Sequence, residues 1–333
     1  MADISFGKEF VNCPLCGAND FILYLKVPVR PDQQGHFHSD VWDLVRCNQC
    51  GLIYINPRPD ANALDVVYSF SNSVDRDFIQ DWFIDGAFLH KKHWQRYIDI
   101  LAKYCPKGTI LDIGCGAGTF LTNARERGYT VFGQEVAPFF IDFCRNQHGL
   151  KIYEGAVEKL GLPTNSFDVV TLFDVIEHVP EPNILIEQCR QLLRPGGIIM
   201  IGTHDIGNWM AHRYGTRWRH LLPIGHLTYF TRGTLTQLLC QNGFKVLQSG
   251  GGHTIDISYR KETRNFIVEF SKTIVLRSLI LGIYKPFARL FPKITHWQIK
   301  LKSNTLNHRI LMARTGGQII MNDEIVAVAI RNG

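Results

Sequence analysis

The sequence predicts an α/β protein built on a doubly wound, mostly parallel sheet of seven strands. From residue 107 onward, short apolar runs alternate with amphipathic helical patterns, which is the order of parallel strands joined by crossover helices. A glycine-rich turn directly follows the first of these runs, and a last β-branched run lies near the end of the chain. The predicted strands are 110–113, 130–134, 150–153, 167–173, 197–203, 245–249 and 324–332, with a helix at 233–244 before the sixth.

Residues 1–58 are predicted to form a small module around two cysteine pairs. Cys13 and Cys16 stand in CPLCG, and Cys47 and Cys50 stand in CNQCG. The glycine after each pair permits a tight turn that points backbone N–H groups at the thiolates. Four thiolates select zinc, and a closed site of four cysteines is structural because it keeps no position open for chemistry. A redox role is disfavoured, since neither pair opens a helix after a strand.

Helical segments are expected on both sides of the core, which we place at residues 107–252. Within residues 59–106, apolar side chains recur at helical spacing, so this segment is predicted to be a helical linker or cap beside the ligand-binding edge of the sheet. Residues 253–310 are basic, apolar and mostly helical in pattern. We interpret them as an insertion before the last strand, with 311–333 returning to the core sheet.

The insertion is predicted to be a lid or a dimer contact. Lys272, Arg277, Lys285 and Arg289 scatter around more than half of the helical wheel, and Pro286 interrupts the helix. A helix lying on a membrane would gather these charges on one face. A homodimer is therefore a possible partner state, and peripheral membrane contact stays open as the alternative.

Composition narrows the class of protein. The 333 residues are 45% hydrophobic and 20% charged, enough for a large core, and we expect neither a signal peptide nor a transmembrane segment. A cytoplasmic address is expected, where nine cysteines favour metal ligands or free thiols over disulfides. The formal net charge of +6 is concentrated in the segment after residue 250. That segment carries 13 Lys and Arg against 5 Asp and Glu. No nucleic-acid partner is expected, because the rest of the chain is slightly acidic.

The turn ILDIGCGAGTF raises the question of which cofactor it holds. Gly114 and Gly116 fit the dinucleotide fingerprint G-x-G-x-x-G, but its third position is Thr119 and Gly118 falls one residue early. Glu135 ends the second strand, where a carboxylate can accept both hydroxyls of an adenosine ribose. That placement fits a nicotinamide dinucleotide and S-adenosylmethionine equally.

Later motifs decide between them. In order and spacing, LDIGCGAGTF, GQEV, SFDVVTLFDVIEHV and LLRPGG resemble the class I S-adenosylmethionine-dependent methyltransferases over residues 107–250. The cysteine module, GLIYINPRP and RWRHLLPIGHLTYFT extend the likeness to bacterial zinc-ribbon-bearing methyltransferases that act on glycans and small metabolites.

The resemblance implies roles for matching positions. Gly114, Gly116 and Gly118 would let the backbone approach the methionine part of the cofactor, Asp112 would order the turn, and Glu135 would hold the ribose. In many relatives an acidic residue after the third strand contacts adenine, but Ala156 stands there in this chain. The adenine contacts then fall to the backbone and Val157, with Glu158 a doubtful substitute. Asp174 completes the expected cofactor set.

Three histidines are candidates for a catalytic base. Methyl transfer to an alcohol or phenol needs a side chain that takes the hydroxyl proton, and histidine serves most often. His178 follows the fourth strand, His204 follows the fifth and His226 lies in PIGHLTYF. Each could instead fix a loop by hydrogen bonds.

These expectations give a function. The sequence predicts a methyltransferase that uses S-adenosylmethionine and a structural zinc ion, and that methylates an oxygen of a sugar, glycan or other small-molecule acceptor. Two alternatives remain: an RNA methyltransferase that grips its substrate with the zinc module, and a non-catalytic binding protein with a methyltransferase fold.

Overall fold

The computed structural model describes residues 7–28, 41–64, 87–250, 314–315, 318–319 and 323–332. The chain divides into two compact units, one made of residues 1–252 with 322–333 and the other of residues 253–321. Of the second unit the structure describes one strand pair, β13 (Arg314–Thr315) with β14 (Gln318–Ile319). The predicted helical insertion at 253–310 therefore lies outside the described residues.

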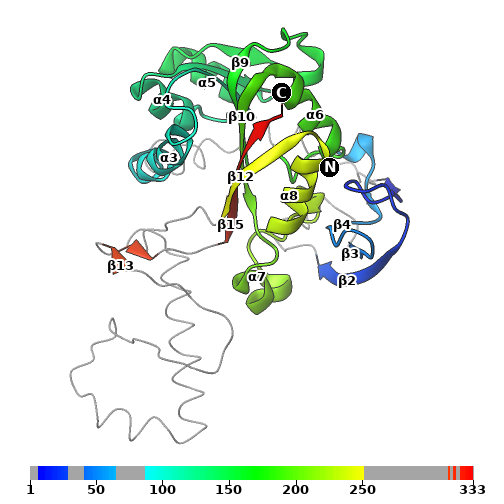
Figure 1. The fold of residues 1–333 in the computed structure, drawn as a ribbon. Coiled ribbons are helices and arrows are strands. Elements are labelled where there is room, and N and C mark those ends of the chain that lie inside the picture. The colour runs from blue at the N-terminus through cyan, green and yellow to red at the C-terminus, as the bar shows by residue number, and fades with distance from the viewer. Residues whose placement is uncertain are drawn as a thin grey trace, which may run out of the picture. The chain divides into compact units, whose positions relative to one another are not determined.

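The first unit is built on a seven-stranded sheet in the order β12-β15-β10-β9-β6-β7-β8 (Figure 1). β15 pairs antiparallel with both β10 and β12, and the remaining pairs are parallel. This confirms the predicted fold class. The strands are β6 (Thr109–Ile113), β7 (Thr130–Glu135), β8 (Ile152–Glu154), β9 (Phe167–Phe173), β10 (Leu193–His204), β12 (Phe244–Gly250) and β15 (Glu324–Arg331).

Most strand boundaries agree with the sequence pattern, and β10 differs most. It begins at Leu193 rather than at residue 197, because Leu193 already pairs with Phe167 before an irregularity in the register. The register resumes at Ile198, so the RPGG segment is looped out between two paired stretches of one strand.

Helices cover both faces of the sheet, as a doubly wound fold requires. Successive β6 residues point to opposite faces: Ile110 packs with residues of α3 (Ala87–Ala102), α4 (Thr119–Glu126) and α5 (Pro138–His148). Leu111 packs with residues of α6 (Pro182–Leu192) and α8 (Arg232–Gln241). Figure 1 shows the same division. The shorter helices are α7 (Trp209–Tyr214), η3 (Val157–Lys159) and η4 (Gly215–Arg217).

The helix predicted within residues 59–106 is α3, and residues 65–86 lie outside the described part of the chain. α3 packs on α4 through aromatic side chains, with the Trp94 and Phe120 rings 5.6 Å apart. Tyr97 of α3 is fully buried and touches the ring of Phe173 at the end of β9. The helix therefore covers the end of the sheet where β9 stops.

The N-terminal module has a sheet of its own, and one strand of it comes from far along the chain. Its order is β11-β4-β3-β2, all antiparallel, where β11 is Thr228–Tyr229. The other strands are β2 (Phe21–Pro28), β3 (Val41–Cys47) and β4 (Ile53–Ile55), and β1 (Lys8–Glu9) pairs with β5 (Arg58–Pro59). The module is thus continuous with the segment that follows His226.

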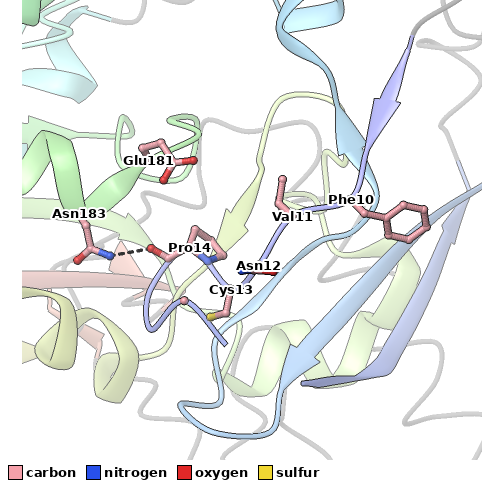
Figure 2. Close-up of a pocket in the computed structure, with 8 residues that line it drawn as sticks. Phe10, Val11, Asn12, Cys13, Pro14, Glu181 and Asn183 are labelled. Atoms are coloured by element: carbon pink, nitrogen blue, oxygen red, sulfur yellow. Dashed lines mark hydrogen bonds between the residues drawn. The ribbon is translucent and has the colours of Figure 1, made fainter. Parts of the chain in front are cut away.

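Polar contacts fix the module against the core. Arg58 donates to the Pro180 carbonyl at 2.8 Å, and Asn183 of α6 donates to the Pro14 carbonyl at 2.7 Å (Figure 2). Gln241, the last residue of α8, donates to the Leu15 carbonyl at 2.8 Å. None of the described helices combines the length and apolarity needed to span a membrane.

Candidate active site

The glycine turn connects β6 to α4 with three left-handed residues. Gly114, Gly116 and Gly118 have φ values of 67°, 52° and 70°, which residues with a Cβ rarely adopt. The amides of Gly114 and Cys115 donate to the Gln134 carbonyl at 2.9 and 3.0 Å. The turn is therefore held against the end of β7.

The three glycines differ in what a Cβ would meet. At Gly114 it would lie 2.6 Å from Val175 Cγ2, and at Gly118 it would lie 2.5 Å from Leu150 Cδ1. At Gly116 nothing lies within 4 Å. Without side chains, Gly114 and Gly118 thus let the turn pack closely against Val175 and Leu150, whereas Gly116 leaves open space above the turn.

Glu135 is buried at the end of β7 and faces this open space through the turn. Its Oε1 accepts the amides of Val136 and Ala137 at 2.7 and 3.0 Å, and its Oε2 accepts the amide of Gly116 at 2.8 Å. A carboxylate offers about four lone-pair directions, so Oε2 retains capacity for a ligand hydroxyl. A buried carboxylate beside a glycine with open space at its Cβ position is suited to bind the ribose of an adenosine cofactor.

Asp112 lies below the turn, inside the sheet. The Thr171 hydroxyl of β9 donates to its Oδ1 at 2.6 Å, which ties the two neighbouring strands together. Burial raises the pKa of Asp112 to about 7. Asp112 is thus a buried link between β6 and β9, two residues before the glycine turn.

The other two predicted cofactor residues lie at the same edge of the sheet, because the carboxyl ends of parallel strands meet there. Val157 begins η3 after β8 and is half-buried against the core. Asp174 follows β9 with a φ of 54°, and its amide donates to the Gly202 carbonyl at 2.9 Å. The Asp174 side chain is 56% exposed, so it is accessible from solvent.

The three candidate histidines come together beyond the ends of β9 and β10. The ring of His226 lies 4.6 Å from that of His178 and 5.4 Å from that of His204, measured between centroids. The three rings come from the turn after β9, the end of β10 and the loop before β11. The sheet edge thus joins residues that are far apart in the sequence.

Hydrogen bonds set the tautomers of two of these rings. His178 Nδ1 lies 2.8 Å from the Gly225 carbonyl oxygen, and His226 Nδ1 lies 2.8 Å from the His220 carbonyl oxygen. A carbonyl can only accept, so both Nδ1 atoms carry the proton and each neutral ring has its lone pair at Nε2. Burial lowers the pKa of His178, which favours the neutral ring.

Glu177 lies at the centre of the cluster and is 2% exposed. Its Oε2 accepts the Thr203 hydroxyl at 2.9 Å, and its Oε1 lies 3.6 Å from His204 Nε2. Burial raises the pKa of Glu177 to about 7. Its carbonyl accepts the amides of Leu227 and Thr228 at 2.8 and 3.2 Å, which holds the His226 loop over the turn after β9.

The cofactor turn and the cluster are adjacent. Val175, which fills the space that the missing Cβ of Gly114 leaves, is separated from Glu177 by one residue. The segment after β9 therefore packs on the glycine turn through Val175 and carries Glu177 and His178 of the cluster.

Sequence reasoning missed four residues that border the cluster. Glu324 starts β15 directly opposite His204 and accepts the Tyr97 hydroxyl at 2.5 Å. The ring of His220 stacks on His204 at 3.4 Å, and Asp323 is fully buried beside it with Oδ2 3.3 Å from His220 Nε2. Burial raises the pKa of Glu324 well above its usual range. The β10–β15 pairing brings Glu324 and Asp323 to the site, and the packing of α3 brings Tyr97, so no local motif marks these three residues. His220 stands within RWRHLLPIGHLTYFT, but that motif alone does not place its ring on His204.

The four cysteines converge as predicted for a metal site. Cys13 and Cys50 Sγ lie 3.5 Å apart, as do Cys16 and Cys47 Sγ, and all four lie within 4.8 Å of one another. Tetrahedral zinc with bonds of about 2.3 Å separates its sulfurs by about 3.8 Å. The thiols therefore fit zinc closely.

A shallow, open hollow lies beside the first cysteine pair (Figure 2). It is lined by Phe10, Val11, Asn12, Cys13, Pro14, Gly17, Glu181 and Asn183. No residue of the glycine turn or of the histidine cluster lines it, so we assign it no role in catalysis.

Comparison with known proteins agrees with this geometry. A family model described as a methyltransferase domain matches residues 88–249, which include the glycine turn, Glu135 and the three histidines. The chain is 31% identical over 195 residues to a ubiquinone biosynthesis O-methyltransferase of Coxiella burnetii, covering 53% of this chain and 82% of that relative. The chain belongs to the S-adenosylmethionine-dependent methyltransferases.

Two further matches to this methyltransferase are weaker. A ubiquinone biosynthesis O-methyltransferase of Xanthomonas oryzae pv. oryzae is 36% identical over 101 residues, which cover 28% of this chain and 42% of the relative. A solved S-adenosylmethionine-dependent methyltransferase from Archaeoglobus fulgidus is 18% identical with a TM-score of 0.49, covering 77% of this chain and all of that one. Membership of this family, rather than the structural likeness, makes S-adenosylmethionine the methyl donor of the enzyme.

Proposed function

We propose that the enzyme methylates a hydroxyl oxygen of a sugar, phenol or other small metabolite. The observation that carries this proposal is the cluster of half-buried His178 and His204 with buried His226 and Glu177. Nitrogen acceptors need no such set of proton acceptors if they arrive neutral, whereas an alcohol or phenol must lose a proton. The Coxiella burnetii relative, named for O-methylation, supports the same class of acceptor.

The donor would be held at the glycine turn. Gly116 offers the open backbone surface, Oε2 of Glu135 offers an acceptor for a ribose hydroxyl, and Val157 offers an apolar contact after β8. When bound, S-adenosylmethionine supplies a methyl group on a positively charged sulfur. Gln134 holds the turn through the amides of Gly114 and Cys115, and Asp112 joins β6 to β9 just before the turn.

The acceptor would lie over the histidine cluster with its hydroxyl toward the imidazole nitrogens. Nε2 of His178 has the lone pair in the neutral tautomer, because Nδ1 donates to the Gly225 carbonyl. We assign His178 as the group that takes the hydroxyl proton. Buried carboxylates around the cluster stabilise the imidazolium that results.

Zinc belongs to the proposal as a structural ion on Cys13, Cys16, Cys47 and Cys50. Its sulfur ligands would all be thiolates in a closed set. Because β4 of this module pairs with β11, the ion would also stabilise the loop that carries His226. We propose that the zinc module positions part of the acceptor site without touching the acceptor.

A labelled-methyl transfer assay tests the function. Purified enzyme, the labelled donor and a panel of sugars, nucleotide-sugars, phenols and matched amines should yield labelled product from one or more hydroxyl acceptors. His148→Gln on α5 serves as a matched histidine control that keeps full activity, whereas His178→Gln should lose most of it. Transfer to amines alone would contradict the assignment to oxygen.

A further inference from the structure

Three side chains of the histidine cluster converge as a metal-binding set. One donor atom from each of Glu177, His204 and His226 lies within 4.8 Å of the other two. The Glu177 Oε1 to His204 Nε2 distance is already 3.6 Å. Bonds of about 2.1 Å to a divalent ion place neighbouring donors about 3 to 3.4 Å apart. A small contraction of the cluster would therefore complete the coordination.

The orientation of His226 is the one that metal ligands adopt. Its Nδ1–H donates to the His220 carbonyl at 2.8 Å, so Nε2 is the nitrogen with the lone pair. Ligating histidines almost always donate the other ring N–H to a carbonyl or carboxylate, which fixes the ring and raises its basicity. This hydrogen bond to the backbone thus leaves His226 Nε2 as the nitrogen that can ligate a cation.

Glu177 supplies an independent observation. Its Oε2 is hydrogen-bonded to Thr203, but its Oε1 is buried and has no hydrogen-bond partner among the described residues. Leaving a buried carboxylate oxygen without a partner costs free energy. Oε1 lies 3.6 Å from His204 Nε2, and a carboxylate oxygen of Glu177 lies within 4.8 Å of a ring nitrogen of His226, so a cation between the three side chains would satisfy the carboxylate.

The surrounding charge favours a cation as well. Asp174 Oδ1 lies 3.6 Å from the same His204 nitrogen, and the buried Glu324 carboxylate forms a second group of possible ligands with Asp174 and His204. Asp323 is also buried there and is paired with Arg219 at 2.7 Å. Several carboxyl groups thus gather around few positive side chains, and a bound cation would favour their ionised forms over the neutral acids.

We propose that Glu177, His204 and His226 bind a divalent cation that ligates the acceptor oxygen. The proposal rests on the proposed function. Two imidazoles and a carboxylate suit ions such as Mn²⁺, Fe²⁺ or Zn²⁺ and leave coordination positions open. An acceptor hydroxyl bound there has a lowered pKa. Its proton passes to Nε2 of His178, the oxygen–methyl bond forms and the methyl–sulfur bond breaks.

Binding of Mn²⁺ to the zinc-loaded enzyme tests the site without any turnover. Mn²⁺ prefers oxygen and nitrogen donors, so the four cysteine thiolates retain zinc and do not contribute. Titration followed by electron paramagnetic resonance should give one bound Mn²⁺ per chain. Glu177→Gln and His226→Gln should each weaken binding by at least about tenfold.

Matched controls separate this site from adventitious surface binding. Glu126→Gln at the exposed end of α4 and His148→Gln on α5 change the same residue types away from the cluster and should leave Mn²⁺ affinity unchanged. If Glu177→Gln does not fold, His226→Gln, checked by circular dichroism, decides the question. No Mn²⁺ binding, or binding that both cluster variants retain, would overturn the proposal.

Methyl transfer is measured separately, with and without Mn²⁺ after brief treatment with EDTA. Rate loss with EDTA and recovery with Mn²⁺ would support the metal-bound acceptor. Full methyl transfer to a hydroxyl by metal-free enzyme would overturn the proposal of a cation site but leave the proposed function intact. Tight Mn²⁺ binding without transfer to any hydroxyl acceptor would instead count against the proposed function.

Discussion

Alanine at Gly114 should mainly lower the stability of the fold, whereas alanine at Gly116 should mainly lower the affinity for the cofactor. Both positions have positive φ, where a residue with a Cβ costs about 1 to 2 kcal/mol. Alanine recovers about 0.4 to 1 kcal/mol through the lower entropy of its unfolded chain. At Gly116 nothing else opposes the methyl group, so Gly116→Ala should cost between about 0 and about 1.6 kcal/mol of folding free energy.

Gly114→Ala should cost more, because its Cβ would lie 2.6 Å from Val175 Cγ2. Valine is short and stiff at χ1, so the contact cannot be relieved by a small rotation. Overpacking of this kind adds about 1 to 3 kcal/mol. The expected loss for Gly114→Ala is therefore about 2 to 4 kcal/mol. In a double-mutant cycle, the additional Val175→Ala substitution should restore the part of the folding free energy that is lost to overpacking.

The assays are urea unfolding followed by circular dichroism and calorimetric titration with S-adenosylhomocysteine. Gly116→Ala should be nearly as stable as the wild type but bind the ligand at least about tenfold more weakly, since its methyl group enters the open space above the turn. Two results would refute this reasoning: unchanged affinity in Gly116→Ala, or equal stability of the two alanine variants.

Three further predictions follow from the site. Because burial raises the pKa of Asp112 to about 7, the folded state binds its proton more tightly than the unfolded state, and stability falls as pH rises from about 4 to about 7 by at most about 1.4 kcal/mol per unit. Asp112→Asn should remove that slope, so urea unfolding at pH 5 and pH 8 should show the variant gaining on the wild type at the higher pH; a constant difference would contradict it. His178→Gln should lower kcat by about 10² to 10⁴ with unchanged affinity for S-adenosylhomocysteine, and an unchanged kcat in the labelled-methyl assay would remove His178 as the base. Cys47→Ser should lower zinc content and methyl transfer together while calorimetric cofactor affinity persists, because β11 pairs with the module; full activity in zinc-free protein would show that the His226 loop is fixed by other means.

The sequence predicted the central sheet because its strands carry a local signal. Strands buried on both faces are apolar runs, such as that of β9, and the glycines of the turn are required by its positive φ values. Both features depend on residues close in the chain. They could therefore be predicted without knowledge of the tertiary structure.

The acceptor side depends on long-range pairing and could be predicted only in part. The three histidines were found from their positions after predicted strands. Glu324 and Tyr97 were not, because their contact arises from the register of β15 on β10 and the packing of α3. The pairing of β11 with β4 joins residues far apart in the chain and has no signal in a two-residue strand.

Glu177 shows the limit of a motif. It stands in the EHV segment that helped to indicate the methyltransferase fold, yet the sequence alone does not give its burial or its distance to His204. Those quantities are what support its part in the proposed acceptor site. The motif thus located the segment, and the structure added the burial and the contacts of Glu177.

The most direct measurement of the central claim is the chemical position of the transferred methyl group. Enzyme incubated with S-adenosylmethionine labelled with ¹³C in its methyl group, and with the acceptor found in the panel, gives a product whose ¹³C resonance reports the atom bonded to the methyl. A methyl group on oxygen, formed by the wild type and lost in His178→Gln, is the expected result. A methyl group on nitrogen or carbon would contradict the assignment of the histidine cluster to hydroxyl acceptors.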